Sequence, residues 1–289
     1  MSKRLVIHIG FHETQTTIIQ ESMFGFRVGL RDHRVIYPQP LSGHPSHLDL
    51  ATALGFNPRP DELTEFDPAA VIERYRRIVE DSPDDATVVL SSEEFCQGNF
   101  RPHALENLQL FVNKLDIETS IVAYVRDPLQ FLLAIYHHEL RDTDSTSSFA
   151  DWVDGFDLSG ADFARRLDPW HEAFGDIAGL RIRDFDAIRA EGVPILADFL
   201  DTCGIGPIDM LSVEHPVAEI HPSLVNALFA VRNAVLKPGI RHDHVVSLLE
   251  ISALMPPVDA AVTHLGIDGA AELSERLGEL ATNRYAEHV

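Results

Sequence analysis

Short apolar runs alternate with longer amphipathic segments over the first two thirds of the chain. The short runs are rich in β-branched residues and end at glycine, proline or polar positions, which is typical of buried strands. The predicted strands are Leu5–Ile9, Arg34–Tyr37, Thr87–Ser91, Thr119–Tyr124 and Leu180–Ile182.

The longer segments carry apolar residues three or four positions apart, the spacing of one helix face. In one of them Val71, Tyr75 and Ile78 share a face, and Pro68 suits the first helical turn. The predicted helices are Thr16–Phe24, a turn at His47–Ala53, Pro68–Glu80, Leu105–Leu115, Pro128–Leu140, Phe149–Val153, Gly160–Phe174, Gly192–Cys203 and most of the chain from about Pro222.

This alternation predicts parallel β-α-β units, in which helices cover both faces of the sheet. We therefore predict a three-layer α/β fold with a parallel sheet flanked by helices. The chain has 289 residues, of which 45% are hydrophobic, so it can bury a large core. We expect a single domain over residues 1–289, with a mainly helical extension at about 206–289.

Polar residues follow three of the predicted strands directly. They lie in the segments Phe11–Thr17, Ser91–Glu94 and Arg126–Pro128. Ligands of parallel sheets bind outside the carboxyl ends of the strands. We therefore expect these segments to meet at one edge of the sheet and to form the site.

The charge of the chain limits its partners. Lys and Arg number 23 against 45 Asp and Glu, which gives a formal net charge of −22. A field of this sign repels nucleic acid and anionic lipid, although a local cationic pocket remains possible. Two distant cysteines and 15 scattered histidines predict neither a disulfide framework nor a metal site. With no long apolar run, we expect a cytoplasmic protein that contacts no membrane.

The segment after the first predicted strand has the outline of a phosphate-binding loop. Gly10 and a group of threonines stand between the strand and a helix, whose unpaired N–H groups attract anions. A Walker A motif fails, because Gln15 and Thr16 stand where Gly and Lys are needed. From these residues alone, an ordinary turn with threonine caps is an equally good interpretation.

The wider sequence resembles the bacterial sulfotransferases. Ile7–Gln20 is similar to their 5′-phosphosulfate loop, I-H-I-G-x-x-K-T-G-T-T-x-x-Q, and Val88–Phe95 to a strand that ends in Ser-x-Glu. Ile121–Pro128, followed by Tyr136, resembles the segment that binds the 3′-phosphate. Weaker similarities follow in the same order at Phe149–Trp152, Trp170–Gly175, Leu180–Phe185, Ala197–Ile205 and Ala281–Tyr285.

This resemblance implies sulfuryl transfer from 3′-phosphoadenosine 5′-phosphosulfate, as co-substrate, to a hydroxyl or amine, with no metal. It implies that the 5′-phosphate contacts lie in the loop and that Arg126 grips the 3′-phosphate with its planar fork. Glu93 is the preferred general base and His47 the second choice. A helix-capping carboxylate and a solvated loop histidine are the alternatives for these two residues. The predicted donor-binding positions are His12, Glu13, Thr14, Gln15, Thr16, Thr17, Arg126 and Ala134.

Three of these positions depart from the family pattern. Glu13 replaces the lysine that contacts the transferred group, and a carboxylate beside a polyanion costs roughly 1–4 kcal/mol. Gln15 replaces a glycine; if that position needs positive φ, the side chain costs about 1 kcal/mol. Ala134 replaces a serine that contacts the 3′-phosphate.

Three hypotheses remain for the function. The first is an active sulfotransferase in which another cation, from Arg27, Arg31 or Arg101, replaces the lysine. The second is a catalytically degenerate relative that acts in binding or assembly, and the third is an enzyme that uses a different donor. We predict a sulfotransferase-family protein and leave open whether it is an enzyme. We expect a small-molecule or glycan acceptor, no nucleic acid, and a possible homodimer.

Overall fold

A computed structural model describes residues 2–57, 66–142, 149–175 and 178–208 of the chain. The chain separates into two compact units. The first runs to Arg126 and resumes at Phe163, and the second covers Asp127–Asp162 of the described residues. The prediction of one domain over residues 1–289 stays a prediction, and the helical extension lies almost wholly outside the described residues.

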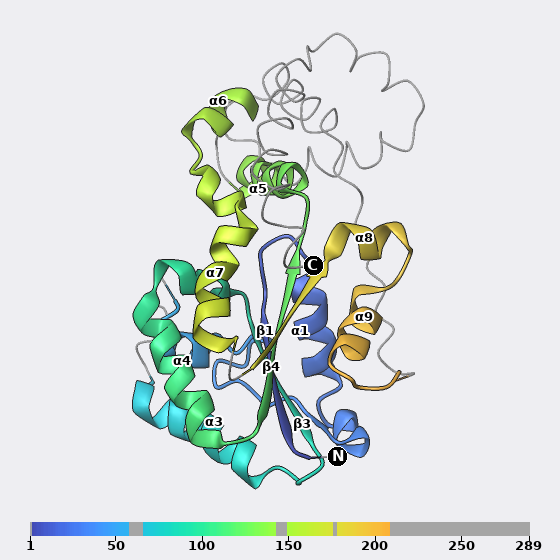
Figure 1. Ribbon diagram of the computed structural model, residues 1–289. Coiled ribbons are helices and arrows are strands. Elements are labelled where there is room, and N and C mark those ends of the chain that lie inside the picture. The colour runs from blue at the N-terminus through green and yellow to red at the C-terminus, as the bar shows by residue number, and fades with distance from the viewer. Residues whose placement is uncertain (1, 58–65, 143–148, 176–177, 209–289) are drawn as a thin grey trace. The chain divides into compact units, whose positions relative to one another are not determined.

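A five-stranded sheet in the order β2-β3-β1-β4-β5 forms the centre of the first unit (Figure 1). Every pairing is parallel, which confirms the predicted parallel α/β architecture. The strands are β1 (Arg4–Ile9), β2 (Val35–Ile36), β3 (Thr87–Ser92), β4 (Glu118–Val125) and β5 (Gly179–Asp184).

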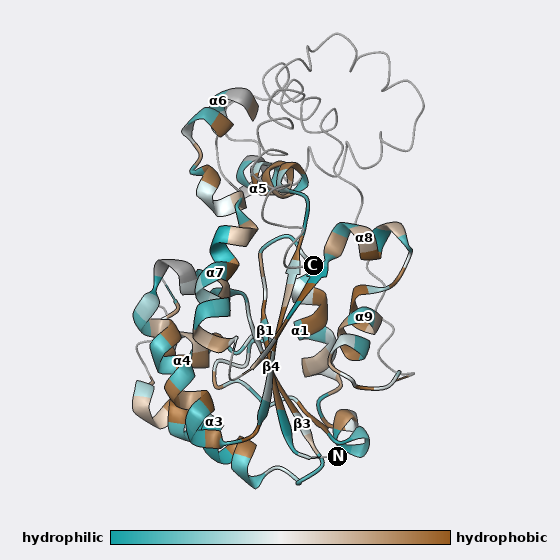
Figure 2. Cartoon of the chain, in the orientation of Figure 1, coloured by the Kyte–Doolittle hydropathy of each residue, from teal (hydrophilic) through white to brown (hydrophobic). Residues whose placement is uncertain are grey.

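The three central strands are almost completely buried because both of their faces are covered. All six residues of β3 are buried, and so are the last seven of the eight residues of β4. Continuous burial of this kind is what helices on both faces of a parallel sheet require. Figure 2 shows hydrophobic positions along these strands, and mixed hydrophilic and hydrophobic positions on the helices around them.

Helices lie on both sides of the sheet in this unit (Figure 1). On the side of α1 and α9, Val6, Val89 and Val122 of the strands pack in one cluster with Ile19 and Phe199. Figure 1 shows α4 and α7 on the other side. The helices of this unit are α1 (Thr16–Gly25), η1 (Gly29–His33), α2 (Leu48–Leu54), α3 (Pro68–Asp81), η3 (Glu93–Phe100), α4 (Pro102–Leu115), α7 (Phe163–Phe174), α8 (Phe185–Ala190) and α9 (Ile195–Thr202).

The second unit contains α5 (Pro128–Asp142), α6 (Phe149–Gly155) and η4 (Leu158–Ala161). Leu133 and Tyr136 of α5 form a small apolar cluster with Phe149 and Trp152 of α6. The Tyr136 and Trp152 rings lie 5.4 Å apart. Aromatic packing therefore joins the two helices.

Three predicted helix starts differ by three residues from the structure, each for a local reason. Helix α4 begins three residues earlier than predicted because Pro102 occupies its first turn. Helix α9 begins later than predicted, at Ile195, because Gly192 has a φ of 70° and Pro194 is the N-cap. The single helix expected over Gly160–Phe174 is divided into η4 and α7.

Helix α8 was missed at the sequence level. Its signal was Asp184, whose side chain accepts a hydrogen bond from the Ala187 N–H at 3.0 Å and caps the helix. Among the described residues, no helix is long and apolar enough to cross a membrane.

Candidate functional site

The carboxyl ends of β1, β3 and β4 lie side by side because β1 pairs with both of the other strands. Ile9 is opposite Ser92 of β3, and His8 is opposite Val122 of β4. The loop after β1, the beginning of η3 and Arg126 therefore meet at one edge of the sheet, as the strand pattern predicted.

The loop between β1 and α1 has an unusual backbone. Glu13 has a φ of 65° and Gln15 a φ of 59°, both in the left-handed region that favours glycine. Gln15 is also the N-cap of α1 and makes no side-chain capping hydrogen bond. Gln15 therefore adopts a positive φ, a conformation in which its side chain costs about 1 kcal/mol relative to glycine.

Gly10 is required for a different reason, which is space. A Cβ at this position would lie 2.4 Å from Cγ2 and 2.6 Å from Oγ1 of Thr16. Both distances are too short for any side chain. Gly10 therefore allows the first residue of α1 to pack directly against the end of β1.

The three loop threonines differ in what their hydroxyls can do. Thr14 donates to the main-chain oxygen of Phe11 at 2.7 Å, and Thr16 donates to the same oxygen at 3.3 Å. Both are buried, whereas Thr17 is exposed. Two of the predicted phosphate contacts therefore hold the loop together, and Thr17 is the exposed residue of the three.

Arg126 ties the loop to the end of β4. Its Nη1 donates to the main-chain oxygen of Glu13 at 2.8 Å, and its Nη2 lies 3.5 Å from Oδ1 of Asp186. Its guanidinium also lies over the ring of Phe185. Only 4% of the side chain is exposed. These contacts stabilise the loop conformation, and the contact of Arg126 with a 3′-phosphate stays a prediction.

His12 and Glu93 form an ion pair across the ends of β1 and β3. Nδ1 of His12 lies 3.4 Å from Oε2 of Glu93, and their side chains are 39% and 34% exposed. The hydrogen bond to Glu93 raises the pKa of His12, and the charges of Glu93 and Glu94 add to it. Burial and the nearby Arg166 act in the opposite direction. Two residues predicted separately, as donor contact and as base, are thus partners.

His47 is completely buried. Its Nδ1 accepts a hydrogen bond from the Ser91 N–H at 3.0 Å, so Nε2 carries the hydrogen and donates to the Pro38 oxygen at 2.9 Å. Burial lowers the pKa of His47 to about 4, although Asp49 and the backbone contacts favour the charged form. Nδ1 thus holds the segment before α2 against β3, and Nε2 holds it against Pro38. Its role as second-choice base stays a prediction.

A second buried histidine, His8, also contacts Ser91. Its Nδ1 lies 2.8 Å from the Ser91 hydroxyl, which also accepts from Nε2 of Gln20 at 3.1 Å. Burial lowers the pKa of His8 to about 3. Ser91 therefore connects β1, α1 and the segment before α2, and this network fixes the end of β3, where Glu93 follows.

Sequence reasoning missed Arg166, a buried cation beside the site. It lies on α7, 4.5 Å from the Phe11 ring centroid, and Nη2 is 3.3 Å from the Cys96 oxygen. The signal was its position on an apolar helix face, three residues after Phe163 and four before Trp170. An arginine on such a face needs partners inside the protein.

The cations proposed to replace the missing lysine are not in the loop. Arg27 and Arg31 follow the C-terminal end of α1, which spans about 15 Å, so they lie far from its N-terminus. Arg27 donates to the Phe24 oxygen there. Arg101 is the N-cap of α4 and donates to the main-chain oxygen of Gly55. Ala134, the third altered position, is buried in α5 of the second unit.

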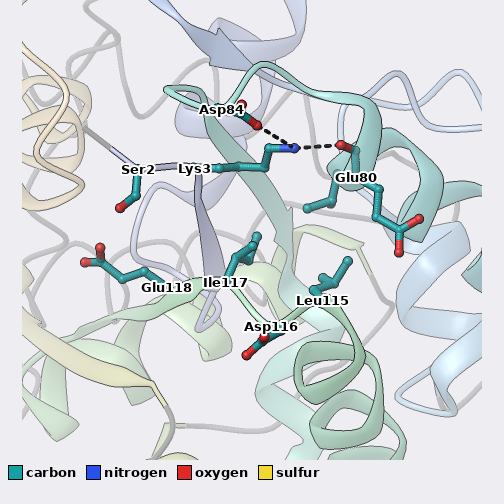
Figure 3. Close-up of a pocket in the computed structure, with 9 residues that line it drawn as sticks. Ser2, Lys3, Glu80, Asp84, Leu115, Asp116, Ile117 and Glu118 are labelled. Atoms are coloured by element: carbon teal, nitrogen blue, oxygen red, sulfur yellow. Dashed lines mark hydrogen bonds and ion pairs between the residues drawn. The ribbon is translucent and has the colours of Figure 1, made fainter.

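A pocket of about 430 Å³ opens at the opposite end of the sheet, where the strands begin. Figure 3 shows Lys3 beside it. Its Nζ donates to the main-chain oxygen of Glu80 at 2.6 Å and lies 4.0 Å from Oδ1 of Asp84. Asp116 and Glu118 come from the turn and the strand that follow α4. The described residues contain no group of three or more His, Cys, Asp or Glu that suits a metal ion.

The chain is similar in structure to bacterial sulfotransferases. A sulfotransferase from Alicyclobacillus acidocaldarius is 15% identical, with a TM-score of 0.46 over 80% of this chain and 92% of that one. The sulfotransferase domain from the curacin biosynthetic pathway is 10% identical, with a TM-score of 0.43 over 86% and 98%. The sulfotransferase domain of the Synechococcus PCC 7002 olefin synthase is 11% identical, with a TM-score of 0.39 over 87% and 95%. No family model and no curated protein matches the sequence.

Proposed function

We propose that the loop between β1 and α1 binds the phosphosulfate end of 3′-phosphoadenosine 5′-phosphosulfate. The protein would then transfer the sulfuryl group to a hydroxyl or amine of a small molecule or glycan. The observation that carries this proposal is the left-handed backbone at both Glu13 and Gln15. Strained conformations of this kind persist where the surrounding structure imposes them, and they cluster at ligand sites.

The strained loop leads into the N-terminus of α1, where unpaired N–H groups and the helix dipole favour an anion. Gly10 lets the helix approach the strand, and Arg126 holds the loop through the oxygen of Glu13. This arrangement fits a phosphate group better than an ordinary turn, because a turn needs neither the strain nor the buried arginine.

Sulfuryl transfer needs a base for the acceptor and stabilisation of the leaving group. The acceptor oxygen or nitrogen would attack sulfur while the bond from sulfur to the phosphate oxygen breaks, and Glu93 would take the acceptor proton. Negative charge then grows on the phosphate. The N–H groups at the start of α1, whose position is fixed before the reaction, would stabilise it.

A second function, nucleotide binding without catalysis, is favoured by Glu13. Its carboxylate stands where charge reversal weakens both donor binding and leaving-group stabilisation. The matched variant is Glu13→Gln, which keeps the shape of the side chain and removes its charge. We expect it to raise the affinity for 3′-phosphoadenosine 5′-phosphate roughly threefold to tenfold. An unchanged affinity would mean that the carboxylate points away from the nucleotide.

Calorimetry with 3′-phosphoadenosine 5′-phosphate tests whether the protein binds the nucleotide. Transfer of labelled sulfate from the donor to a panel of phenols and amines then distinguishes an enzyme from a protein that binds without catalysis. We expect saturable binding by the wild-type protein. Absence of heat at millimolar ligand would exclude this donor. Binding without transfer would favour the non-catalytic form. A cytoplasmic location and a homodimer belong to the same proposal, and fractionation and sedimentation would test them.

A further inference from the structure

A cation beside the loop would strengthen the binding of an anionic donor, since Glu13 adds negative charge and the chain as a whole carries a formal charge of −22. The described arginines beside the loop, Arg126 and Arg166, make their contacts with other residues of the chain. Arg126 is bound to the Glu13 oxygen and Asp186, and Arg166 contacts Cys96 and the Phe11 ring. Their side chains are almost completely buried.

His12 differs from these arginines in position and exposure. It belongs to the loop itself, and 39% of its side chain is exposed. Its partner Glu93 begins η3, at the end of the neighbouring strand β3. The pair therefore stands at the edge of the sheet where the ligand is proposed to bind.

The geometry of the pair decides which nitrogen faces a ligand. Because Nδ1 lies against a carboxylate, it carries a hydrogen, and Nε2 is the remaining nitrogen. In the neutral ring, Nε2 would present a lone pair, which repels an anion. In the imidazolium, Nε2 carries a hydrogen and donates to it.

We propose that His12, oriented by Glu93, is the cation through which the loop contacts its anionic donor, so that the donor binds the imidazolium form. His12 is then a binding residue, and Glu93 orients it in addition to its proposed role as the base. This inference rests on the proposed nucleotide binding. It replaces Arg27, Arg31 and Arg101 as the substitute for the missing lysine.

The charged groups that face His12 agree with this role. Glu93 and Glu94 of η3 favour the imidazolium, whereas Arg166 of α7 disfavours it. A bound phosphate would add a further negative charge and raise the pKa of His12 again. By linkage, the affinity for the anion must fall as pH rises from the free to the bound pKa of His12.

The test uses the full chain, with 3′-phosphoadenosine 5′-phosphate as the probe. Its affinity is measured between about pH 5.5 and 8.5 for wild type, His12→Gln and Glu93→Gln, and NMR follows the His12 ring in the wild-type protein. The ratio of wild-type to His12→Gln affinity cancels the titration of the ligand itself. We expect this ratio to fall by up to about tenfold per pH unit in the linked window.

The nucleotide should also raise the pKa of His12, and Glu93→Gln should lower it and move the linked window to lower pH. His103, which pairs with Glu106 on the exposed face of α4, provides the control, and His103→Gln should behave as the wild type. Nucleotide binding with a constant ratio across pH, or with an unchanged His12 pKa, would overturn the inference and leave the proposed function standing. Absence of binding at every pH overturns both.

Discussion

The two ends of the parallel sheet carry the same backbone feature with different meanings. At the starting ends of the strands, Asp116 adopts a left-handed conformation as the C-cap of α4, beside the pocket. That is a common way to end a helix, and aspartate tolerates it. At the carboxyl ends, Glu13 and Gln15 adopt the same conformation two residues apart, before a helix begins.

The difference teaches that a cavity and a candidate site need not coincide. The pocket beside Asp116 is bordered by Lys3 and by exposed carboxylates such as Asp84, which is an ordinary solvated surface. The carboxyl end has buried histidines, a buried arginine and strained loop residues, none of which helix termination explains. Strain and burial of charge, rather than volume, are the features that single out the candidate site.

Acid should affect the carboxyl end most strongly. His8 and His47 are buried in the neutral form, with pKa values lowered to about 3 and about 4, whereas the unfolded chain binds protons near pH 6.5. Their stabilisation is present above pH 6.5 and is lost as pH falls. Between pH 6.5 and 5, the two residues together should lower the free energy of unfolding by roughly 3 kcal/mol.

The measurement is urea unfolding at a series of pH values. His12 works in the opposite direction, because its raised pKa means that it gains its charge, and its ion pair with Glu93, as the pH falls through that pKa. His8→Phe should remove about half of the slope, and His103→Gln, on the surface, should leave it unchanged. An unchanged slope in His8→Phe would show that His8 titrates like a solvated histidine.

Arg126→Ala should have the next largest effect. It removes the donor to the Glu13 oxygen and leaves Asp186 without its guanidinium partner. We expect a loss of about 2 kcal/mol in the free energy of unfolding. Nucleotide affinity should fall at least tenfold, because the loop is no longer held. Arg126→Lys, which keeps the charge and loses the fork, should recover stability more than affinity. If the alanine variant binds the nucleotide normally, the loop does not depend on this tether.

Parts of this site could be predicted from the sequence, because they depend on neighbours in the chain. The apolar runs of β1, β3 and β4, and the polar residues after them, were sufficient to bring the loop, Glu93 and Arg126 to one edge. The loop position of Gly10 and the unusual residue Gln15 were also visible in the local sequence. These are consequences of strand pairing and backbone sterics, which short sequence patterns record.

The missing parts depend on contacts between distant segments. The sequence pattern brings His12 and Glu93 to the same edge but does not predict that they pair, or that Ser91 connects His8 with the segment before α2. Arg166 contacts Phe11 because α7, which begins at Phe163, packs beside the loop. Solvent exposure, which separates His12 from His47, is also a property of the packed structure.

Gln15→Gly compares the strain at the two ends directly. Glycine adopts a φ of 59° without a Cβ clash but loses more entropy on folding, so we expect a gain of about 0.5–1 kcal/mol in the free energy of unfolding. Asp116→Gly is the matched control at the other end, with an expected gain of a few tenths of a kcal/mol. Only Gln15→Gly should change nucleotide affinity. Equal effects of both variants on binding would remove the distinction between the two ends.

Lys3→Ala should have the smallest effect, although it lines the pocket. Its amine contacts the Glu80 oxygen and lies at the limit of ion-pair distance from Asp84, which is fully exposed. Surface contacts of this kind contribute little, so we expect a change within about 0.5 kcal/mol and no change in nucleotide affinity. The assays are urea unfolding and calorimetry with the nucleotide. A clear loss of affinity would place the anion at the starting ends of the strands, and the strained loop would then need another explanation.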